Sequence, residues 1–407
     1  MYITHLSLTN FRNFTRLDID LPTGSILLVG ANAQGKTSLL EAIYYLATFV
    51  SFYTINDRHL INFLSARQPL AVGRIVADYC RAGASHRLEV RIIQDASNTN
   101  GQPRTRKEVL LDGMKRKVSE TLGQFNAALF LPQMLRLVEG APEERRHYLN
   151  LVLAQVVPHY AAALADYNRS LSQRNALLKL LNERGGDVNQ LDYWDALLTA
   201  SGSRLIYNRI RSIQELERLA ASAHYELTQG REVLRLAYEP AYDPLPQPDR
   251  QYALPLDAPL DRSGISLEKI QQGFHQALVQ LRPEEIARGM TTIGPHRDDL
   301  RFLCNGIDLC VYGSRGQGRT VVLALKLAEV VWMKAKTGEW PVLLLDEVLA
   351  ELDAERRSDL LTRLSLCDQT LLTTTDLDLY TSDFVHTTSL WYVREGRLHQ
   401  PGAGEVP

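Results

Sequence analysis

The 407-residue sequence has few cysteines, no long apolar run and almost no net charge, and each absence excludes a class of protein. Its four cysteines, at positions 80, 304, 310 and 367, form no C-x-x-C pair, so we expect neither a zinc site nor a disulfide framework. No apolar stretch approaches the roughly 18 residues that cross a membrane, and the N-terminus lacks the pattern of a signal peptide. A net charge of −2 confines any nucleic-acid-binding surface to a local patch. We therefore expect a protein of the reducing cytoplasm, without a membrane partner.

Residues 30–37, G-A-N-A-Q-G-K-T, fit the phosphate-binding pattern G-x-x-x-x-G-K-[ST]. The apolar run before them is suited to a buried strand, and the run after them has helical spacing. Glycines let backbone N–H groups converge on phosphate oxygens, Lys36 supplies a positive charge at the β- and γ-phosphates, and the Thr37 hydroxyl suits Mg²⁺. A glycine-rich turn with an incidental lysine is the alternative interpretation. The nucleotide-binding residues expected here are Gly30, Ala31, Asn32, Ala33, Gln34, Gly35, Lys36, Thr37 and Ser38.

A second apolar run, residues 342–345, ends in Asp346 and Glu347. A buried strand would carry Asp346 to the carboxyl edge of a sheet, where α/β proteins bind their ligands. Its carboxylate is suited to hold Mg²⁺, and Glu347 is placed to polarise the attacking water. Together with Lys36, these two acids are the candidate catalytic residues. Acids at strand ends also commonly cap the next loop, which is the alternative when this run is taken alone.

Residues 312–320, Y-G-S-R-G-Q-G-R-T, precede a helical run and form a third candidate anion site. A Ser-x-Gly-Gln turn at a helix start combines backbone N–H groups with the helix dipole. It resembles the signature motif of ABC-type ATPases, normally S-G-G-Q, with Arg315 in place of the first glycine. The resemblance implies that Ser314, Arg315, Gly316 and Gln317 contact nucleotide bound by a second subunit, so that two heads close over two ATP molecules. An ordinary glycine-rich helix start is the alternative.

The pattern of elements divides the chain into three parts. Residues 1–135 are rich in predicted strands. Residues 136–290 contain long charged segments whose apolar residues have helical spacing, and residues 291–407 again show strand patterns. We expect an α/β fold: an ABC-type ATPase head of mixed sheets around a P-loop helix, interrupted by a mostly helical arm, or lobe II. A helical subdomain packed against the head is the alternative to an arm. Pro158 should end or kink the first long helix, and the proline-rich residues 239–262 should form a linker.

Five stretches spread over the whole chain resemble the RecF family of bacterial recombination mediators, relatives of Rad50 and the SMC proteins. The match G-P-H-R-D-D-L is highly specific, whereas the P-loop alone is not. Departures from the family pattern are Gln133 and Asn150, where Glu and Asp are usual, and Glu347, where Asp is usual. The five stretches are residues 8–14, 30–43, 130–146, 294–300 and 314–353.

The resemblance implies a weak DNA-dependent ATPase that acts in DNA repair, replication and the SOS response, with ATP and Mg²⁺ as cofactors. It implies an ATP-dependent homodimer that binds duplex DNA near single-strand gaps and, with RecO and RecR partners, helps load recombinase. It also implies a metal-sensing role for Gln133 and a phosphate contact for Arg12, for which a structural ion pair is the alternative. His296 and Arg297 have either a structural or a catalytic role. The alternative function is a nucleotide-gated adaptor whose main output is partner recruitment, with slow hydrolysis.

Basic residues gather around one predicted hairpin, whose turn is Asp112-Gly113. Opposed on two short strands, they would neutralise DNA phosphates; a solvated hairpin is the alternative. These candidates are Arg104, Arg106, Lys107, Lys115, Arg116 and Lys117. Further arginines of the helical part are interspersed with acids and are interpreted first as ordinary helix surface, with DNA contact as the second interpretation. They are Arg169, Arg174, Arg184, Arg204, Arg209 and Arg211.

Overall fold

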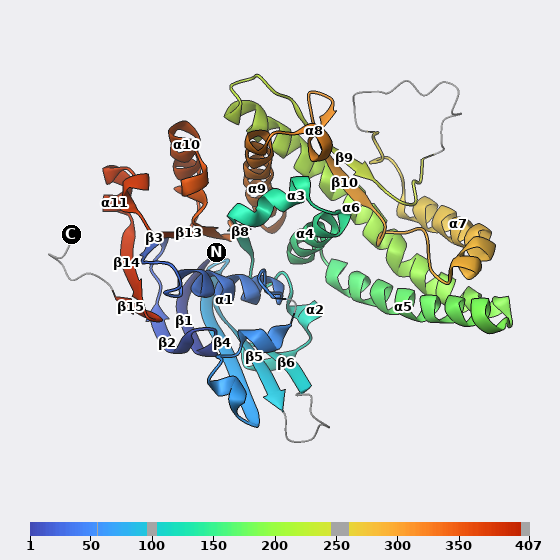
Figure 1. The fold of residues 1–407 in the computed structure, drawn as a ribbon, viewed down its shortest axis with the longest axis horizontal. Coiled ribbons are helices and arrows are strands. Elements are labelled where there is room, and N and C mark those ends of the chain that lie inside the picture. Colours follow the sequence, from blue (N-terminus) through green and yellow to red (C-terminus); the bar gives the residue numbers. More distant parts are fainter. Residues whose placement is uncertain (55, 96–103, 246–259, 400–407) are drawn as a thin grey trace. The chain divides into compact units, whose positions relative to one another are not determined.

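The computed structural model describes residues 1–54, 56–95, 104–245 and 260–399 (Figure 1). The chain forms two compact units: Met1–Gln133 with Met333–Pro407, and Met134–Trp332. The first unit is therefore assembled from both ends of the sequence, with the second inserted between them. Most of the proline-rich linker predicted at residues 239–262 lies outside the described residues. Within the described ranges, no helix is both long enough and apolar enough to cross a membrane.

A six-stranded sheet with a parallel centre belongs to the first unit. Neighbouring strands from β14 to β8 run parallel, and β15 is antiparallel to β14. Every residue of β12 and β13 is buried, as expected for parallel strands covered on both faces. Only β13 separates β3 from β12, the strands that precede the two predicted nucleotide motifs. The spatial order is β15 (Arg397–His399), β14 (Ser389–Arg394), β3 (Gly24–Val29), β13 (Gln369–Thr374), β12 (Val342–Asp346) and β8 (Ala127–Phe130).

A second sheet of the first unit is wholly antiparallel and has one apolar face. Leu8, Ile75, Val90 and Val109 pair in one row across four strands, and all four are buried. Because directly paired residues lie on the same side of a sheet, this row marks the core face. The strand order is β2 (Phe14–Asp20), β1 (Tyr2–Phe11), β4 (Leu70–Arg81), β5 (Ala84–Asp95), β6 (Arg104–Leu111) and β7 (Met114–Arg116). The helices of this unit are α1 (Lys36–Thr48), α2 (Val118–Thr121), α10 (Ala354–Leu364) and α11 (Ser382–Thr387).

Long helices dominate the second unit, and a small antiparallel sheet accompanies them (Figure 1). The predicted break at Pro158 is confirmed, since α4 ends at Val156 and α5 begins at Tyr160. At 37 residues, α6 is about 55 Å long. The helices are α3 (Arg136–Glu139), α4 (Pro142–Val156), α5 (Tyr160–Arg184), α6 (Leu191–Leu227), α7 (Leu267–Arg288), α8 (Leu309–Tyr312) and α9 (Arg315–Thr337), which continues past the unit boundary. The sheet order is β11 (Ile307–Asp308), β10 (Asp299–Cys304) and β9 (Leu234–Glu239).

The second compact unit extends to Trp332, past the boundary predicted near residue 290. Strand β9, which the sequence analysis missed, pairs with β10 from Glu239 opposite Asp299 to Leu234 opposite Cys304. This pairing ties the segment after residue 291 to the inserted unit. The Ser314 motif therefore belongs to the second unit and not to the sheets of the first.

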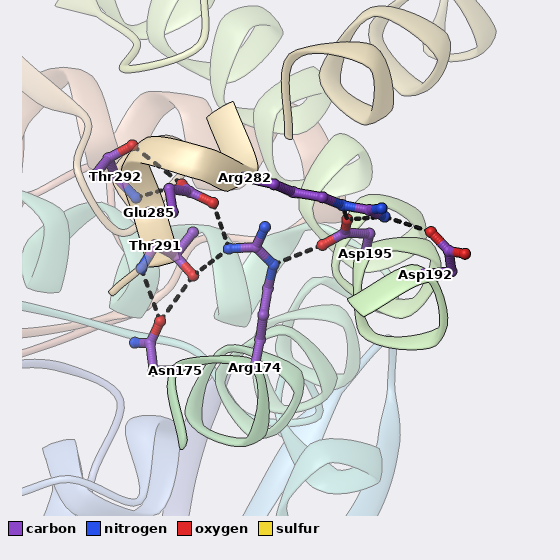
Figure 2. A network of polar contacts seen from close by, with 8 residues as sticks. All are labelled: Arg174, Asn175, Asp192, Asp195, Arg282, Glu285, Thr291 and Thr292. Carbon is purple, nitrogen blue, oxygen red and sulfur yellow. Dashed lines mark hydrogen bonds and ion pairs between the residues drawn. The ribbon is translucent and has the colours of Figure 1, made fainter. Parts of the chain in front are cut away.

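Arg174 is a buried ion-pairing residue, so its interpretation as helix surface or DNA contact is wrong. Its side chain is fully buried on α5, where Nε donates to Asp195 of α6 at 2.6 Å and Nη1 donates to Glu285 of α7 at 2.6 Å. Figure 2 shows Arg174 between these two acids, with Arg282 reaching the same Asp195 from the other side. Buried charges are costly unless they are paired, and these two ion pairs tie α5, α6 and α7 together.

Arg209 of α6 is likewise buried, and it anchors the G-P-H-R-D-D-L segment. Its guanidinium donates to the Asp298 carboxylate at 2.6 Å and to the Asn150 side-chain oxygen at 3.0 Å. Asp298 also accepts from the Tyr238 hydroxyl at 2.5 Å. Asp298 neutralises the charge of Arg209, and the neutral Asn150 amide accepts one further bond from the same guanidinium. This residue, too, is neither helix surface nor a DNA contact.

Candidate functional site

The loop between β3 and α1 requires glycine at two positions. A side chain on Gly30 would meet the backbone oxygen of Val393 at 2.5 Å. Gly35 has a φ of 117°, and a side chain there would meet Asn13 at 2.5 Å. The Asn13 amide in turn donates to the Gln34 carbonyl at 3.1 Å. Close contacts with Val393 and Asn13 therefore exclude side chains at Gly30 and Gly35, and the hydrogen bond from Asn13 holds the loop at Gln34.

Lys36, the first residue of α1, folds back over this loop. Only 4% of its surface is exposed, and its Nζ donates to the carbonyls of Gly30 at 2.6 Å and Ala31 at 3.1 Å. The same ammonium lies 3.3 Å from a carboxylate oxygen of Glu347. One positive charge is thus held between the loop and the end of β12, where it can attract phosphate oxygens.

Thr37 and Asp346 meet directly. The Thr37 hydroxyl is 2.9 Å from each carboxylate oxygen of Asp346, and the Thr373 hydroxyl of β13 donates to the same carboxylate at 2.7 Å. Burial raises the pKa of Asp346 above its usual value, the nearby Glu347 charge adds to this, and the two hydroxyl donors oppose it. A hydroxyl and a carboxylate are the hard oxygen ligands that Mg²⁺ prefers, so the donor set fits this ion.

Glu347 occupies a strained position at the end of β12. Its φ is 53°, in the left-handed region that few residues other than glycine adopt. Its N–H donates to the Thr373 hydroxyl at 3.0 Å, which holds the backbone in this turn. The side chain is 39% exposed, so its carboxylate can reach a water molecule as well as Lys36.

These groups line one cavity of about 530 Å³ within the first unit. That volume is in the range of sites for ligands of nucleotide size. Gly30 and Ala31 do not line the cavity and instead hold Lys36 through their carbonyls. Lining residues from the sequence candidates are Asn32, Ala33, Gln34, Gly35, Lys36, Thr37, Ser38, Arg12, Gln133, Asp346 and Glu347.

Four contributors to the cavity or its surroundings were not among the candidates. Asn13, Tyr53 and Pro132 line the cavity, and Thr373 bridges Asp346 and Glu347. Thr373 is one of three threonines, residues 373–375, that follow the apolar residues of β13 as Asp346 follows those of β12, so the sequence does single out this stretch. Nothing in the sequence distinguishes Tyr53, which is 50% exposed at the cavity.

Arg12 and Gln133 both reach the cavity wall. Arg12 makes a bidentate pair with the buried Glu41 carboxylate, at 2.7 Å for both contacts, and donates to the His59 carbonyl at 3.1 Å. It therefore forms a structural ion pair beside the cavity. The Gln133 amide lies 3.5 Å from the Tyr53 hydroxyl.

The Ser314 motif forms the exposed N-terminus of α9 in the second unit. The Ser314 hydroxyl accepts from the Gln317 N–H at 3.2 Å, and the Gln317 side-chain oxygen accepts from the Ser314 N–H at 3.1 Å. This reciprocal capping leaves the N–H groups of Arg315 and Gly316 at an open helix start. Ser314, Arg315 and Gly316 are all exposed.

The basic hairpin exists, with its turn at Asp112 and Gly113, whose φ values are 49° and 79°. Its six basic residues nevertheless do not form one patch. Arg104 and Arg106 share a face with Lys115, which pairs with Leu110, whereas Arg116 pairs with Val109 on the other face. Lys117 follows β7 and precedes α2.

Lys107 lies on the core face, unlike its neighbours in β6. Its Nζ donates to the Phe49 carbonyl at 2.6 Å, contacts Asp57 at 3.0 Å and lies over the Tyr45 ring. Burial lowers its pKa. Of the six basic candidates, Arg104, Arg106 and Lys115 therefore share the outward face of β6 and β7.

The G-P-H-R-D-D-L segment has structural contacts throughout. The Tyr167 hydroxyl lies 2.6 Å from His296 Nδ1, and Asp299 receives two bonds from Arg145, at 2.7 and 2.9 Å. Arg145 belongs to the stretch of residues 130–146, so two of the five family-like stretches interlock here. Arg297 is exposed and contacts the Met290 sulfur.

A P-loop and a Mg²⁺-type carboxylate on two parallel strands separated only by β13, together with a Ser-Arg-Gly-Gln helix start, define an ATPase head of the ABC type. The family described as the RecF/RecN/SMC N-terminal domain matches residues 2–387. The DNA replication and repair protein RecF of Chloroflexus aurantiacus is 41% identical, over 98% of this chain and 99% of that protein. The chain belongs to the RecF family.

Solved structures agree with this assignment. A structure of the recombination mediator protein RecF with ATP, in the RecFOR pathway, is 27% identical and covers 98% of both chains with a TM-score of 0.82. The Smc head domain of Pyrococcus furiosus, bound to part of ScpA, is 16% identical with a TM-score of 0.50 and covers 98% of this chain and 95% of that one. The second likeness concerns the fold alone.

Proposed function

We propose that this chain is an ATP-gated DNA-binding protein of recombinational repair and replication. As an ATP-dependent dimer, it binds duplex DNA near single-strand gaps and, with RecO and RecR partners, helps load recombinase. Membership of the RecF family supports this role, since the curated relatives are DNA replication and repair proteins. The observation that carries the proposal is the convergence of Lys36, Thr37, Asp346 and Glu347 on one cavity.

ATP occupies the cavity with its phosphates against the loop of residues 30–37. Lys36 exchanges its loop carbonyls for phosphate oxygens, and the N–H groups at the start of α1 face the same anion. Thr37 and Asp346 would hold Mg²⁺, which neutralises phosphate charge when bound. Ser38 lines the same wall.

Glu347 polarises the water that attacks the γ-phosphate. Its carboxylate is partly exposed and is fixed by the turn at the end of β12. The Thr373 hydroxyl bonds both the Asp346 side chain and the Glu347 backbone N–H, so a movement of one acid displaces the other through Thr373. Hydrolysis by this arrangement is weak until DNA completes the assembly.

A second subunit completes each site through Ser314 and Gly316. The exposed start of α9 offers N–H groups and a dipole to the γ-phosphate of the partner's ATP. Arg315, which replaces the usual small residue, adds a positive charge at this place. ATP therefore holds two heads together by contacting both of them, and hydrolysis lets the heads separate.

DNA meets the outward-facing residues of β6 and β7. Arg104, Arg106 and Lys115 lie on one side of this edge of the sheet, with Glu108 between Arg106 and Lys115. Such an edge binds phosphates without reading base sequence. Arg106 is 64% and Lys115 69% exposed, so both can exchange Glu108 for DNA.

The experiment is ATP hydrolysis by the full chain with no DNA, single-stranded DNA, duplex DNA and gapped duplex DNA. We expect duplex and gapped DNA to raise turnover and single-stranded DNA to have little effect. Lys36→Met removes the response by abolishing nucleotide binding, while Lys179→Met, an exposed lysine of α5, serves as the matched control. Equal turnover under all four conditions would contradict the proposal.

A further inference from the structure

A histidine, a glutamate and a cysteine that have no role assigned above converge in the second unit. His224 is on the last turn of α6, Glu232 is in the connection to β9, and Cys304 ends β10. One possible ligand atom from each lies within 4.8 Å of the others. His224 Nε2 and Glu232 Oε2 are 3.6 Å apart.

Backbone hydrogen bonds fix the segments next to these three residues. The Thr228 N–H donates to the His224 carbonyl at 2.9 Å, which ends α6. Leu234 pairs with Cys304, and the Asn305 N–H donates to the Val233 carbonyl at 3.0 Å. His224 and Cys304 are therefore positioned by a helix and a strand, and Glu232 by the short connection between α6 and β9.

The three groups are mostly buried, and Glu232 lies on the solvent side. His224 is fully buried and Cys304 is 3% exposed, whereas the Glu232 side chain is 23% exposed. One imidazole nitrogen, one carboxylate oxygen and one sulfur match the ligand types of Zn²⁺, and the sulfur disfavours Mg²⁺ and Ca²⁺. In a tetrahedral zinc site, neighbouring ligand atoms are about 3.3–3.8 Å apart, a spacing that these side chains reach with small adjustments.

We propose that His224, Glu232 and Cys304 bind one Zn²⁺ ion, with a water molecule in the fourth position on the solvent side. The thiol proton of Cys304 passes to solvent when the metal binds. The proposal departs from the expectation of no zinc site, which rested on the absence of a C-x-x-C pair. The three ligands come from separate segments of the chain and do not have C-x-x-C spacing, so no short sequence motif predicts them.

Zinc at this place would also brace the Ser314 motif. One Glu232 oxygen faces His224, and the other accepts a bond from the Gln317 side chain at 2.9 Å. Gln317 in turn caps the turn at Ser314. Metal binding orders Glu232 and, through it, the start of α9. This last consequence rests on the proposed function, whereas binding of the metal does not.

The test is titration of the chelator-treated full chain with Co²⁺, followed by its absorbance spectrum. Co²⁺ replaces Zn²⁺ in such sites, and a bound thiolate gives an intense near-ultraviolet band that Co²⁺ in water or on surface carboxylates lacks. We expect one Co²⁺ per chain with this band, and its loss when Zn²⁺ is added. Folded wild-type protein without the band would overturn the proposal, whatever its ATPase activity.

Variants identify the ligands. Cys304→Ser should abolish the band, and Cys310→Ser, which alters an exposed cysteine of the same unit, should leave it unchanged. Glu232→Gln changes a partly exposed side chain and should weaken Zn²⁺ binding at least tenfold. Circular dichroism checks that each variant folds. Equal Co²⁺ spectra in wild type and both cysteine variants would mean adventitious binding, and the cluster would then be a local hydrogen-bonded triad.

Discussion

The Thr37 hydroxyl lies 2.9 Å from both carboxylate oxygens of Asp346, a residue 309 positions further along the chain. This contact joins the start of α1 to the end of β12, and β13 places Thr373 against the same carboxylate. The P-loop and the Asp346 strand can each be predicted from the sequence, but only the folded sheet brings them together into one nucleotide site.

Replacing Thr37 separates the role of its hydroxyl from that of its size. Thr37→Val should lower Mg²⁺-dependent ATP affinity by about 10- to 100-fold, because it removes the hydroxyl ligand and leaves Asp346 with one donor fewer. Thr37→Ser keeps the hydroxyl and should bind ATP nearly as wild type does. Equilibrium binding of a fluorescent ATP analogue, with Mg²⁺ and with EDTA, measures both. Equal affinity of the two variants in Mg²⁺ would exclude Thr37 as a metal ligand.

Glu347 is expected to act in hydrolysis and not in binding. Glu347→Gln should bind ATP normally and hydrolyse it at least about 100-fold more slowly, since the amide cannot accept a proton from water. Single-turnover hydrolysis and ATP binding measure the two steps. Glu183→Gln, at an exposed glutamate of α5, is the isosteric control. A variant that lost ATP affinity to the same degree as turnover would contradict this assignment.

The buried Arg209 should be essential for stability. Arg209→Met leaves Asp298 and Tyr238 buried beside an apolar chain, which should cost about 3–5 kcal/mol of unfolding free energy. Arg204→Met, at an exposed arginine of the same helix, should change it by less than about 0.5 kcal/mol. Urea unfolding followed by circular dichroism gives both values. Similar midpoints for the two variants would show that the ion pair contributes little.

Acid should destabilise the second unit through His296. Burial lowers the pKa of His296 to about 4, the Arg297 and Arg146 charges add to this, and a bond to the Thr291 carbonyl and the Asp298 charge oppose it. Between about pH 6.5 and pH 4, the unfolded chain binds a proton that the folded chain does not. Stability is therefore greatest above pH 6.5 and falls by up to about 3 kcal/mol toward pH 4.

Urea unfolding of wild type and His296→Asn at several pH values tests this dependence. The variant should be less stable at pH 7, because it loses the contact with the Tyr167 hydroxyl, and should lose less stability than wild type between pH 6.5 and pH 4. Parallel pH profiles of the two proteins would contradict the assignment.

DNA affinity should depend on the face to which each basic residue of β6 and β7 belongs. Arg106→Gln with Lys115→Gln should weaken duplex binding and reduce the slope of log affinity against log salt by about 2, because two phosphate contacts are lost. Lys107→Met should lower stability instead and leave the salt slope unchanged, since Lys107 is held by Phe49 and Asp57. Fluorescence anisotropy with labelled duplex at several salt concentrations measures the slope. If Lys107 alone changed the slope, the core-facing side would be the DNA surface.

Local patterns predicted several features of both units. The P-loop, the strand that carries Asp346, the break at Pro158 and the turn at Asp112 each depend on a few adjacent residues, and each has a clear sequence signal. Alternation along β6 could also have separated Lys107 from Arg106, because successive side chains of a strand face opposite sides.

Long-range pairing could not be predicted in the same way. The buried state of Arg174 depends on Glu285, which is 111 positions away and on another helix. The boundary at Trp332 depends on the pairing of β9 with β10 across the segment that contains α7. Charged side chains in a helical pattern look the same whether they face water or a buried partner, so their period alone does not separate the two.

The measurement that tests the central claim most directly is the mass of the Glu347→Gln chain by light scattering, with and without ATP and Mg²⁺. We expect the mass to double from 45.9 kDa only when ATP is present. The same chain with Ser314→Arg added should still bind ATP and remain a monomer. A Glu347→Gln chain that binds ATP and stays at 45.9 kDa, with or without gapped DNA, would contradict an ATP-gated dimer.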